Sequence, residues 1–182
     1  MNRRSFFEML GVASAVLGLS RASSAQSGPD AEARLRELGL TLPEAAGPVA
    51  AYVPFRISGN QVFIAGNIPP LDLDIPTAGK VGADLTPEQG YTAARLAALR
   101  VIAQLKVACN GDLNRVVKAL QIRGFVSCTA EFTGQSGVVN GASDLFREVF
   151  GEAGLAARAA IGTNSLPLNA SVEIESIWEI RT

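Results

Sequence analysis

Five β-rich runs and two helical patterns alternate between residues 51 and 181 of this chain, in the order β-β-α-β-α-β-β. The β-rich runs span residues 51–57, 61–66, 116–129, 157–161 and 171–181, and the helical patterns span 86–109 and 140–152. Each helix and each sheet must bury one apolar side against another layer. The order therefore predicts one α+β domain, in which a single sheet carries both helices on one face.

The first long helical pattern has clear local signals. Thr86, Pro87 and Gln89 form a capping box with proline at the first helical position, and Asn110-Gly111 ends the pattern. Apolar residues that recur every three or four positions define its core-facing stripe: Ala94, Ala98, Ile102, Leu105 and Cys109. A shorter amphipathic helix is expected between Asp30 and Leu40.

The first 25 residues resemble an export signal more than a folded element. Arg3-Arg4 matches the twin-arginine pattern, residues 9–19 form an apolar run too short to span a bilayer, and Ser23 and Ala25 suit a cleavage site. We therefore expect a twin-arginine signal peptide at 1–25, an N-terminal extension with a short helix at 26–41 and the main domain at 42–182. The mature protein would be periplasmic, without stable membrane association. The alternative is a cytoplasmic protein with an amphipathic start.

Charge and composition exclude several classes of function. Removal of residues 1–25 leaves 13 basic and 16 acidic residues, without the clustered Lys and Arg that a nucleic acid-binding surface needs. The chain has no histidine, which excludes a His-based zinc site and a Ser-His-Asp triad. The two cysteines, Cys109 and Cys128, could form a disulfide in an oxidising compartment, but two buried thiols are the preferred interpretation.

Arg158 is the most informative polar residue because it stands alone in a β-rich run of small apolar residues. Its guanidinium keeps its proton and has five donors, so it must be solvated, paired with an acid or available to an anionic ligand. The small neighbours Ala157, Ala159 and Ala160 leave room for such a ligand. A salt bridge or an outward-facing position on an edge strand is the structural alternative.

Glu173 and Glu175 are two residues apart in the last β-rich run and therefore project from the same face. A carboxylate there could activate a water molecule or protonate a leaving group, although solvated acids on an open sheet face are common. Asp72 and Asp74 alternate in a proline-rich loop, a pattern that is usually solvated, and no metal site is expected. No phosphate-binding glycine spacing occurs.

The motifs together resemble the YjgF/Rid (reactive intermediate deaminase, RidA-like) family, in particular its longer YjgF-like or chorismate-mutase-like branch, whose members carry an endoribonuclease name. The resemblance covers residues 42–182. It is carried by PVAAYV (48–53), AGNIP (65–69), VNGAS (139–143), ARAAIG (157–162) and Leu166-Pro167 followed by SVEIE (171–175). The spacing of Arg158, the Leu-Pro pair and Glu173 matches the family.

The resemblance implies a chorismate-mutase-like fold with one mixed sheet and two helices on one face. It also implies a homotrimer whose active sites lie at the subunit interfaces. In this pattern Arg158 grips the substrate carboxylate, Glu173 helps to position water, and the backbone carbonyl of Ala160 lies near that water. Tyr52 and Asn140 match positions near the pocket. Two departures remove polar groups: Ala65-Gly66-Asn67 replaces Ser-Gly-Gln, and Gly162 replaces a glutamate.

The function expected from the resemblance is hydrolytic deamination of small 2-imino acids to 2-keto acids and ammonia. No cofactor is expected, because a protonated imine is already an electrophile. The principal alternative is a non-enzymatic periplasmic protein of the same fold that binds or senses a small carboxylate. Ribonuclease activity fits poorly with an acidic chain that lacks histidine.

Overall fold

The computed structural model describes residues 30–45, 47 and 51–182, so the expected signal peptide lies outside the described residues. The elements occur in the predicted order, after a short N-terminal helix. The strands are β1 (Phe55–Ser58), β2 (Gln61–Asn67), β3 (Val116–Ser127), β4 (Ala157–Thr163) and β5 (Val172–Ile180). The α-helices are α1 (Ala31–Glu37), α2 (Pro87–Ala108) and α3 (Gln135–Phe150). Three 3-10 turns complete the chain: η1 (Leu113–Arg115), η2 (Gly151–Gly154) and η3 (Pro167–Asn169).

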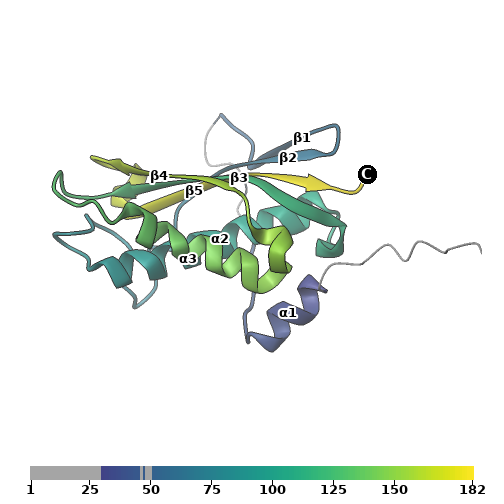
Figure 1. Cartoon of the computed structure of the whole chain (residues 1–182), viewed down its shortest axis with the longest axis horizontal. Coiled ribbons are helices and arrows are strands. Elements are labelled where there is room, and N and C mark those ends of the chain that lie inside the picture. Colours follow the sequence, from purple (N-terminus) through teal and green to yellow (C-terminus); the bar gives the residue numbers. More distant parts are fainter. Residues whose placement is uncertain (1–29, 46, 48–50) are drawn as a thin grey trace, which may run out of the picture.

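The strands form one mixed sheet in the order β1-β2-β5-β3-β4, in which only the β3–β4 pair is parallel. Helices α2 and α3 lie side by side beneath it, and the opposite face of the sheet carries no helix among the described residues (Figure 1). The predicted α+β class and the one-sided helix layer are confirmed. We call the uncovered side the open face.

The core lies between the sheet and the two helices. Buried and partly exposed residues alternate along β5, so that one side of the strand faces the helices. Trp178 projects from this side and makes an edge-to-face contact with Phe146 of α3, with the two ring centroids 5.0 Å apart. The four predicted stripe residues of α2 and its C-cap Cys109 are all fully buried. Helices α2 and α3 approach closely at Gly141, where an added Cβ would overlap the carbonyl oxygen of Tyr91.

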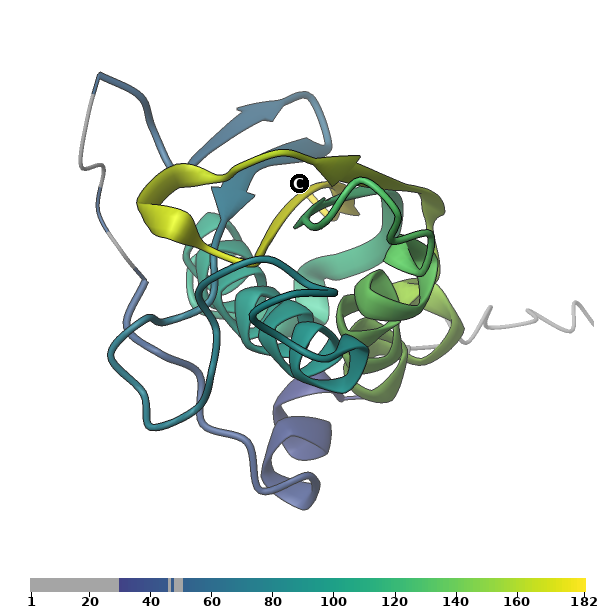
Figure 2. The ribbon, with the colours of Figure 1, turned by 90° about the vertical axis from the view of Figure 1, so that its left-hand side faces the viewer.

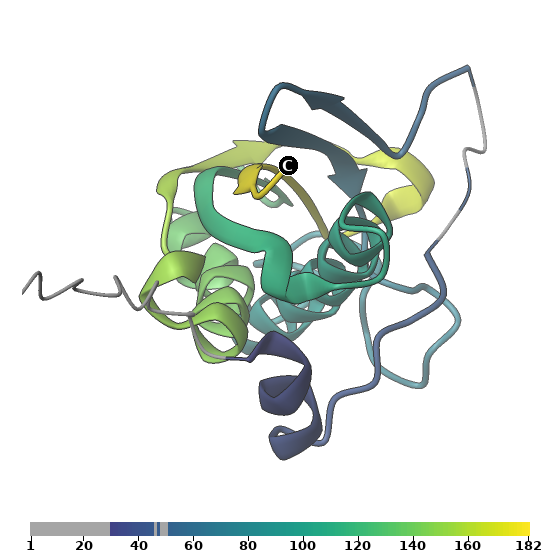
Figure 3. The ribbon, with the colours of Figure 1, turned by 90° about the vertical axis from the view of Figure 1, so that its right-hand side faces the viewer.

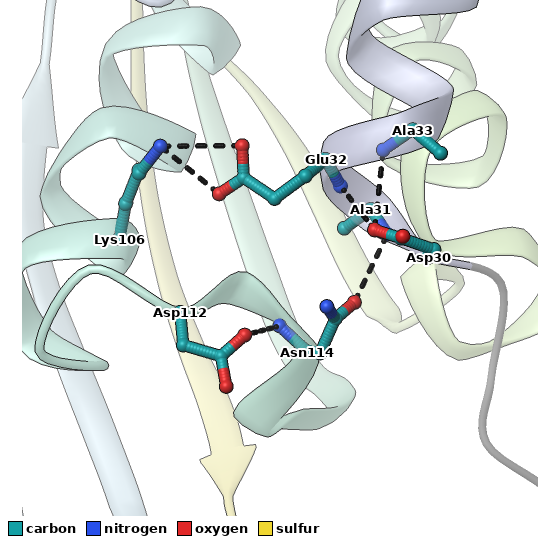
Figure 4. A network of polar contacts seen from close by, with 7 residues as sticks. All are labelled: Asp30, Ala31, Glu32, Ala33, Lys106, Asp112 and Asn114. Carbon is teal, nitrogen blue, oxygen red and sulfur yellow. Dashed lines mark hydrogen bonds and ion pairs between the residues drawn. The ribbon is translucent and has the colours of Figure 1, made fainter.

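Helix α1 packs on the side of the helix layer that is remote from the sheet (Figures 1, 2 and 3). Asp30 caps it by accepting a hydrogen bond from the Glu32 amide, 3.0 Å away. The Glu32 carboxylate pairs with Lys106 of α2 at 3.0 Å, and the Ala31 amide donates to Asn114 at 3.2 Å (Figure 4). These contacts attach α1 to α2 and to η1.

Two strand or helix starts differ from the prediction by four residues or more. Helix α3 begins at Gln135 rather than at 140, because its N-cap is Gly134, which makes no side-chain hydrogen bond and leaves no capping signal in the sequence. Strand β1 begins at Phe55 rather than at 51, after Pro54, which has no backbone N–H to donate to a neighbouring strand.

Cys109 and Cys128 are both buried and free, which confirms the preferred interpretation of two thiols. Burial raises the pKa of the Cys109 thiol. No helix among the described residues is long and apolar enough to cross a membrane.

Candidate active site

Arg158 lies on the edge strand β4, opposite Ile122 of β3, and its side chain projects toward the helix layer. Its Nη1 donates to Asn140 Oδ1 at 2.7 Å and to Ser143 Oγ at 3.0 Å, and its Nη2 donates to Ser136 Oγ at 3.0 Å. All these partners are neutral groups of α3. Within the described part of the chain no carboxylate lies within 4.0 Å of this guanidinium, which is exposed. The salt-bridge alternative is therefore wrong for the described chain.

Glu173 projects from β5 on the open face, as predicted, together with Glu175. The two acids have different surroundings. Glu175 pairs with Arg123 at 2.6 Å, whereas Glu173 has no ion-pair partner among the described residues. Glu173 is half-buried, and this burial raises the pKa of its carboxyl group, with a smaller contribution from the charge of Glu175.

Gly66 makes room for the Glu173 carboxylate. Strand β2 has an irregularity between Ile64 and Asn67, where its register with β5 shifts. An added Cβ at Gly66 would overlap Oε1 of Glu173. The Asn67 side chain donates to the carbonyl of Ala65 at 2.8 Å, inside the same irregularity. The observed position of the Glu173 carboxylate therefore depends on glycine at position 66.

Glu173 lines a cavity of about 530 Å³ at the end of the sheet. This cavity, which we call the Glu173 cavity, lies where β2 ends and β5 begins. Two of its lining residues, Ala65 and Asn67, differ from the family pattern, and Arg100 of α2 lines it as well. The other lining residues are Gly47, Tyr52, Gly66, Ile68, Pro167 and Leu168.

Arg158 and Glu173 do not meet within one chain. Glu173 is registered with Phe125 of β3, which is registered with Ile161 of β4, so two strand spacings and three residues separate the two positions. With ordinary strand geometry this places their Cα atoms about 14 Å apart. The side chains also lie on opposite faces, because Ile122, opposite Arg158, is buried under the helices.

The predicted site residues thus form two separate groups. Asn140 contacts Arg158 directly, and Ala160 lies two residues along the same strand, partly packed against the core. Tyr52 lines the Glu173 cavity and is 47% exposed. Gly162 lies in neither group, but lines a separate cavity of about 410 Å³ beside Cys128 and Gln135.

Sequence reasoning missed three polar residues that the fold brings to these groups. Ser136 and Ser143 hold the Arg158 guanidinium, and Arg100 lines the Glu173 cavity. Arg100 is absent from the apolar stripe of α2, and the helical periodicity gave no sign that it would line a cavity. Within the described residues, no group of three or more acidic or cysteine side chains is close enough to hold a metal ion.

The mixed sheet with a one-sided helix layer and two spatially separate polar groups defines a chorismate-mutase-like α+β protein. A family model described as "YjgF/chorismate mutase-like, putative endoribonuclease" matches residues 32–179. The chain belongs to this family, which confirms the resemblance inferred from its motifs.

Similar proteins come from several organisms. The Trypanosoma cruzi protein TCP17 is 43% identical over 81% of this chain and 92% of its own length. The crystal structure of Atu1372 from Agrobacterium tumefaciens, described as a protein of unknown function, is 46% identical, with 84% of this chain and 94% of that chain covered and a TM-score of 0.76. A putative endoribonuclease from Shewanella oneidensis is 37% identical, with 82% and 99% covered and a TM-score of 0.78.

A more distant structure, TdcF from E. coli with bound serine, is 23% identical, covers 76% of this chain and 94% of that chain, and has a TM-score of 0.53. It shares the fold.

Proposed function

We propose that this protein is a hydrolytic deaminase of small 2-imino acids, with active sites between the subunits of a homotrimer. The observation that carries the proposal is the contrast between Glu173 and Glu175. Glu175 is paired with Arg123. Glu173 is half-buried beside a cavity, the pKa of its carboxyl group is raised, and no cation among the described residues lies within 4.0 Å of it. A carboxyl group in such surroundings is suited to proton transfer.

In the proposed reaction, Arg158 neutralises the substrate carboxylate and Glu173 accepts a proton from a water molecule. The water oxygen bonds to C2 of the protonated imine and gives a carbinolamine. Glu173 then returns the proton to the nitrogen. The C2–N bond breaks while the hydroxyl proton of the carbinolamine passes back to Glu173, which leaves a 2-keto acid and ammonia, and the ammonia takes up that proton. The protonated imine and one water are thus converted to keto acid and ammonium, so the step requires no cofactor. In this proposal Tyr52 contacts the substrate, and the Ala160 carbonyl, from the chain that supplies Arg158, contacts the water.

The surroundings of Arg158 suit reversible binding of an anion. Its Nη atoms are held by Asn140 and two serines, and its Nε has no partner among the described residues. A carboxylate can replace neutral contacts of this kind at lower cost than it could replace a resident acid. In the E. coli protein TdcF, which has the same fold, the bound ligand is also a small carboxylate, serine.

A shared site explains why the two groups are separate in one chain. A substrate of four or five carbon atoms cannot span about 14 Å through a sheet. A second copy that packs on the open face could bring its Arg158 to the Glu173 cavity. The open face has apolar side chains for such a contact, including Phe63 and Ile161, each 40% exposed.

The test is a coupled assay in which an amino-acid oxidase generates the imine and the appearance of keto acid is followed. Arg158→Ala is expected to lower kcat/KM by at least about 100-fold, because a charge-assisted pair of hydrogen bonds is lost. Arg147→Ala, which removes an exposed arginine of α3, is the matched control. Unchanged turnover in Arg158→Ala, with the control also active, would remove the mechanism.

A small-carboxylate binding protein or sensor of the same fold is the second candidate. The observation that favours it is the absence of hydroxyl and acidic side chains at Ala65 and Gly162, where the family pattern has polar groups. Retention of 2-oxobutanoate by the wild-type protein without any turnover of imine would support this function against the deaminase.

We further propose that the protein reaches the periplasm through the twin-arginine route. This route carries folded proteins, so folding would precede export. The proposal rests on Arg3-Arg4, the apolar run and the small residues before Gln26.

A further inference from the structure

Arg100 of α2 is a cation for which the proposed reaction has no use. It lines the Glu173 cavity, and its Nη1 donates one hydrogen bond, to the carbonyl of Ile68 at 3.2 Å. Arg95, which lies earlier on the same helix, has a carboxylate partner in Glu148. Arg100 has no carboxylate within 4.0 Å among the residues that the structure describes.

A half-buried guanidinium with one neutral partner retains unused donors. Its charge is permanent, so it cannot relieve the cost of burial by losing a proton, and the remaining N–H groups favour an anion with planar oxygen geometry. Glu173 lines the same cavity but does not form an ion pair with Arg100, because the two charged groups are more than 4.0 Å apart. The cavity therefore has room for an anionic group beside Arg100.

The charges of the proposed site indicate which class of substrate it binds. The carboxylate common to all 2-imino acids is assigned to Arg158, and Glu173 is assigned to the water. Arg100 is then a second cation, which a substrate with a neutral side chain would leave unpaired. A cavity of about 530 Å³ is within the size range of sites for whole small molecules.

We propose that Arg100 binds a second carboxylate, on the side chain of the substrate, so that the preferred substrates are 2-imino dicarboxylic acids of four or five carbons. This inference rests on the proposed function for the reaction, but its prediction for ligand binding is independent of turnover. Arg100 is a specificity residue, and the Ile68 carbonyl holds it in place at the cavity wall.

The experiment compares binding of 2-oxoglutarate, a dicarboxylate, with binding of 2-oxobutanoate, a monocarboxylate, by isothermal titration calorimetry on the full mature chain. Wild-type protein is expected to bind 2-oxoglutarate about 10- to 100-fold more tightly. Arg100→Met should lose this preference and leave the 2-oxobutanoate affinity within about twofold. Arg147→Met, the same exchange on an exposed arginine, should behave like wild type.

Two results would overturn the inference. One is equal affinity of the wild-type protein for both ligands. The other is an equal loss of both affinities in Arg100→Met, which would mean that Arg100 only supports the chain at Ile68. Arg100→Lys covers the case in which the methionine variant fails to fold, because it keeps the charge and should retain part of the dicarboxylate preference.

Turnover assays distinguish a failure of this inference from a failure of the proposed deaminase function. Iminosuccinate from an L-aspartate oxidase and a neutral imino acid from an L-amino-acid oxidase are supplied in parallel. Arg100→Met should lower kcat/KM for iminosuccinate alone. If wild-type protein hydrolyses neither imine but binds 2-oxoglutarate through Arg100, the deaminase is wrong and the dicarboxylate assignment stands for a binding protein.

Discussion

The carboxylate of Glu173 occupies the space that a side chain on Gly66 would need. The irregularity in β2 and the acid on β5 are therefore one structural unit, although more than a hundred residues separate them in the sequence. A Cβ at position 66 would force the flexible Glu173 side chain to move its carboxylate out of this position.

Substitution of Gly66 by alanine tests this relationship. Gly66→Ala should displace the Glu173 carboxylate and lower kcat by about 10- to 100-fold, a partial loss of the roughly 100- to 10,000-fold that a positioned general base contributes. Gly137→Ala on α3, where an added Cβ meets nothing within 4 Å, should retain the fold. A crystal structure of Gly66→Ala with Glu173 unmoved would contradict the steric argument.

The pH dependence of activity should follow Glu173. A base must be deprotonated, and burial raises the pKa of this carboxyl group, so kcat/KM should fall as pH decreases through a value above the ordinary glutamate pKa of 4.5. Glu173→Gln should abolish this dependence along with most of the activity. Glu175→Gln, which removes the acid paired with Arg123, should keep the acidic limb of the profile.

The same pKa shift predicts an effect on stability. The folded state binds the Glu173 proton more tightly than the unfolded state, so stability decreases as pH rises from the ordinary pKa of glutamate through the raised one. Glu173→Gln should therefore increase the melting temperature at pH 7, and the gain should shrink at pH values below 4.5. Thermal unfolding of both proteins across this pH range measures the difference.

Mixing two inactive variants tests whether the site is shared between subunits. A trimer that contains Arg158→Ala chains and Glu173→Gln chains has some interfaces with an intact Arg158 from one chain and an intact Glu173 from another. Joint refolding should therefore restore a substantial part of the wild-type activity. Each variant refolded alone is the control, and no gain on mixing would contradict a site that Arg158 and Glu173 share between subunits.

The close packing of α2 and α3 predicts a stability effect remote from the cavity. Gly141→Ala would force the two helices apart at the Tyr91 carbonyl and should destabilise the protein by about 1–3 kcal/mol, as overpacking of cores does. Chemical denaturation measures the change, and full stability of the variant would contradict the close approach of the two helices at this position.

Export can be tested by fractionation. With Arg3 and Arg4 both replaced by lysine, the protein should accumulate in the cytoplasm at its unprocessed length, whereas the native chain should be found in the periplasm after cleavage near Ala25. Equal distribution of the two forms would contradict the proposed route.

The amino-acid sequence by itself determined the features that depend on neighbouring residues. The capping box at Thr86, the apolar stripe of α2 and the period of β5 are local patterns, and each gave the correct element. The isolation of Arg158 among small residues singled out this cation, and no carboxylate lies within 4.0 Å of it among the described residues. The two largest boundary errors were the start of α3, which has no side-chain cap, and the start of β1, where the effect of Pro54 was not recognised.

The tertiary structure decided which polar groups meet, because those contacts join residues that are distant in the chain. The spacing of residues along β5 predicted that Glu173 and Glu175 share a face. The tertiary structure decided that Arg123 of β3 pairs with Glu175 and that a cavity lined in part by β2 lies beside Glu173. Sheet order places β3 between the strands that carry Arg158 and Glu173. The register of these strands places the two side chains on opposite faces of the sheet. No periodicity within one segment encodes such relationships, since they depend on register between strands and on the path of the chain after β2.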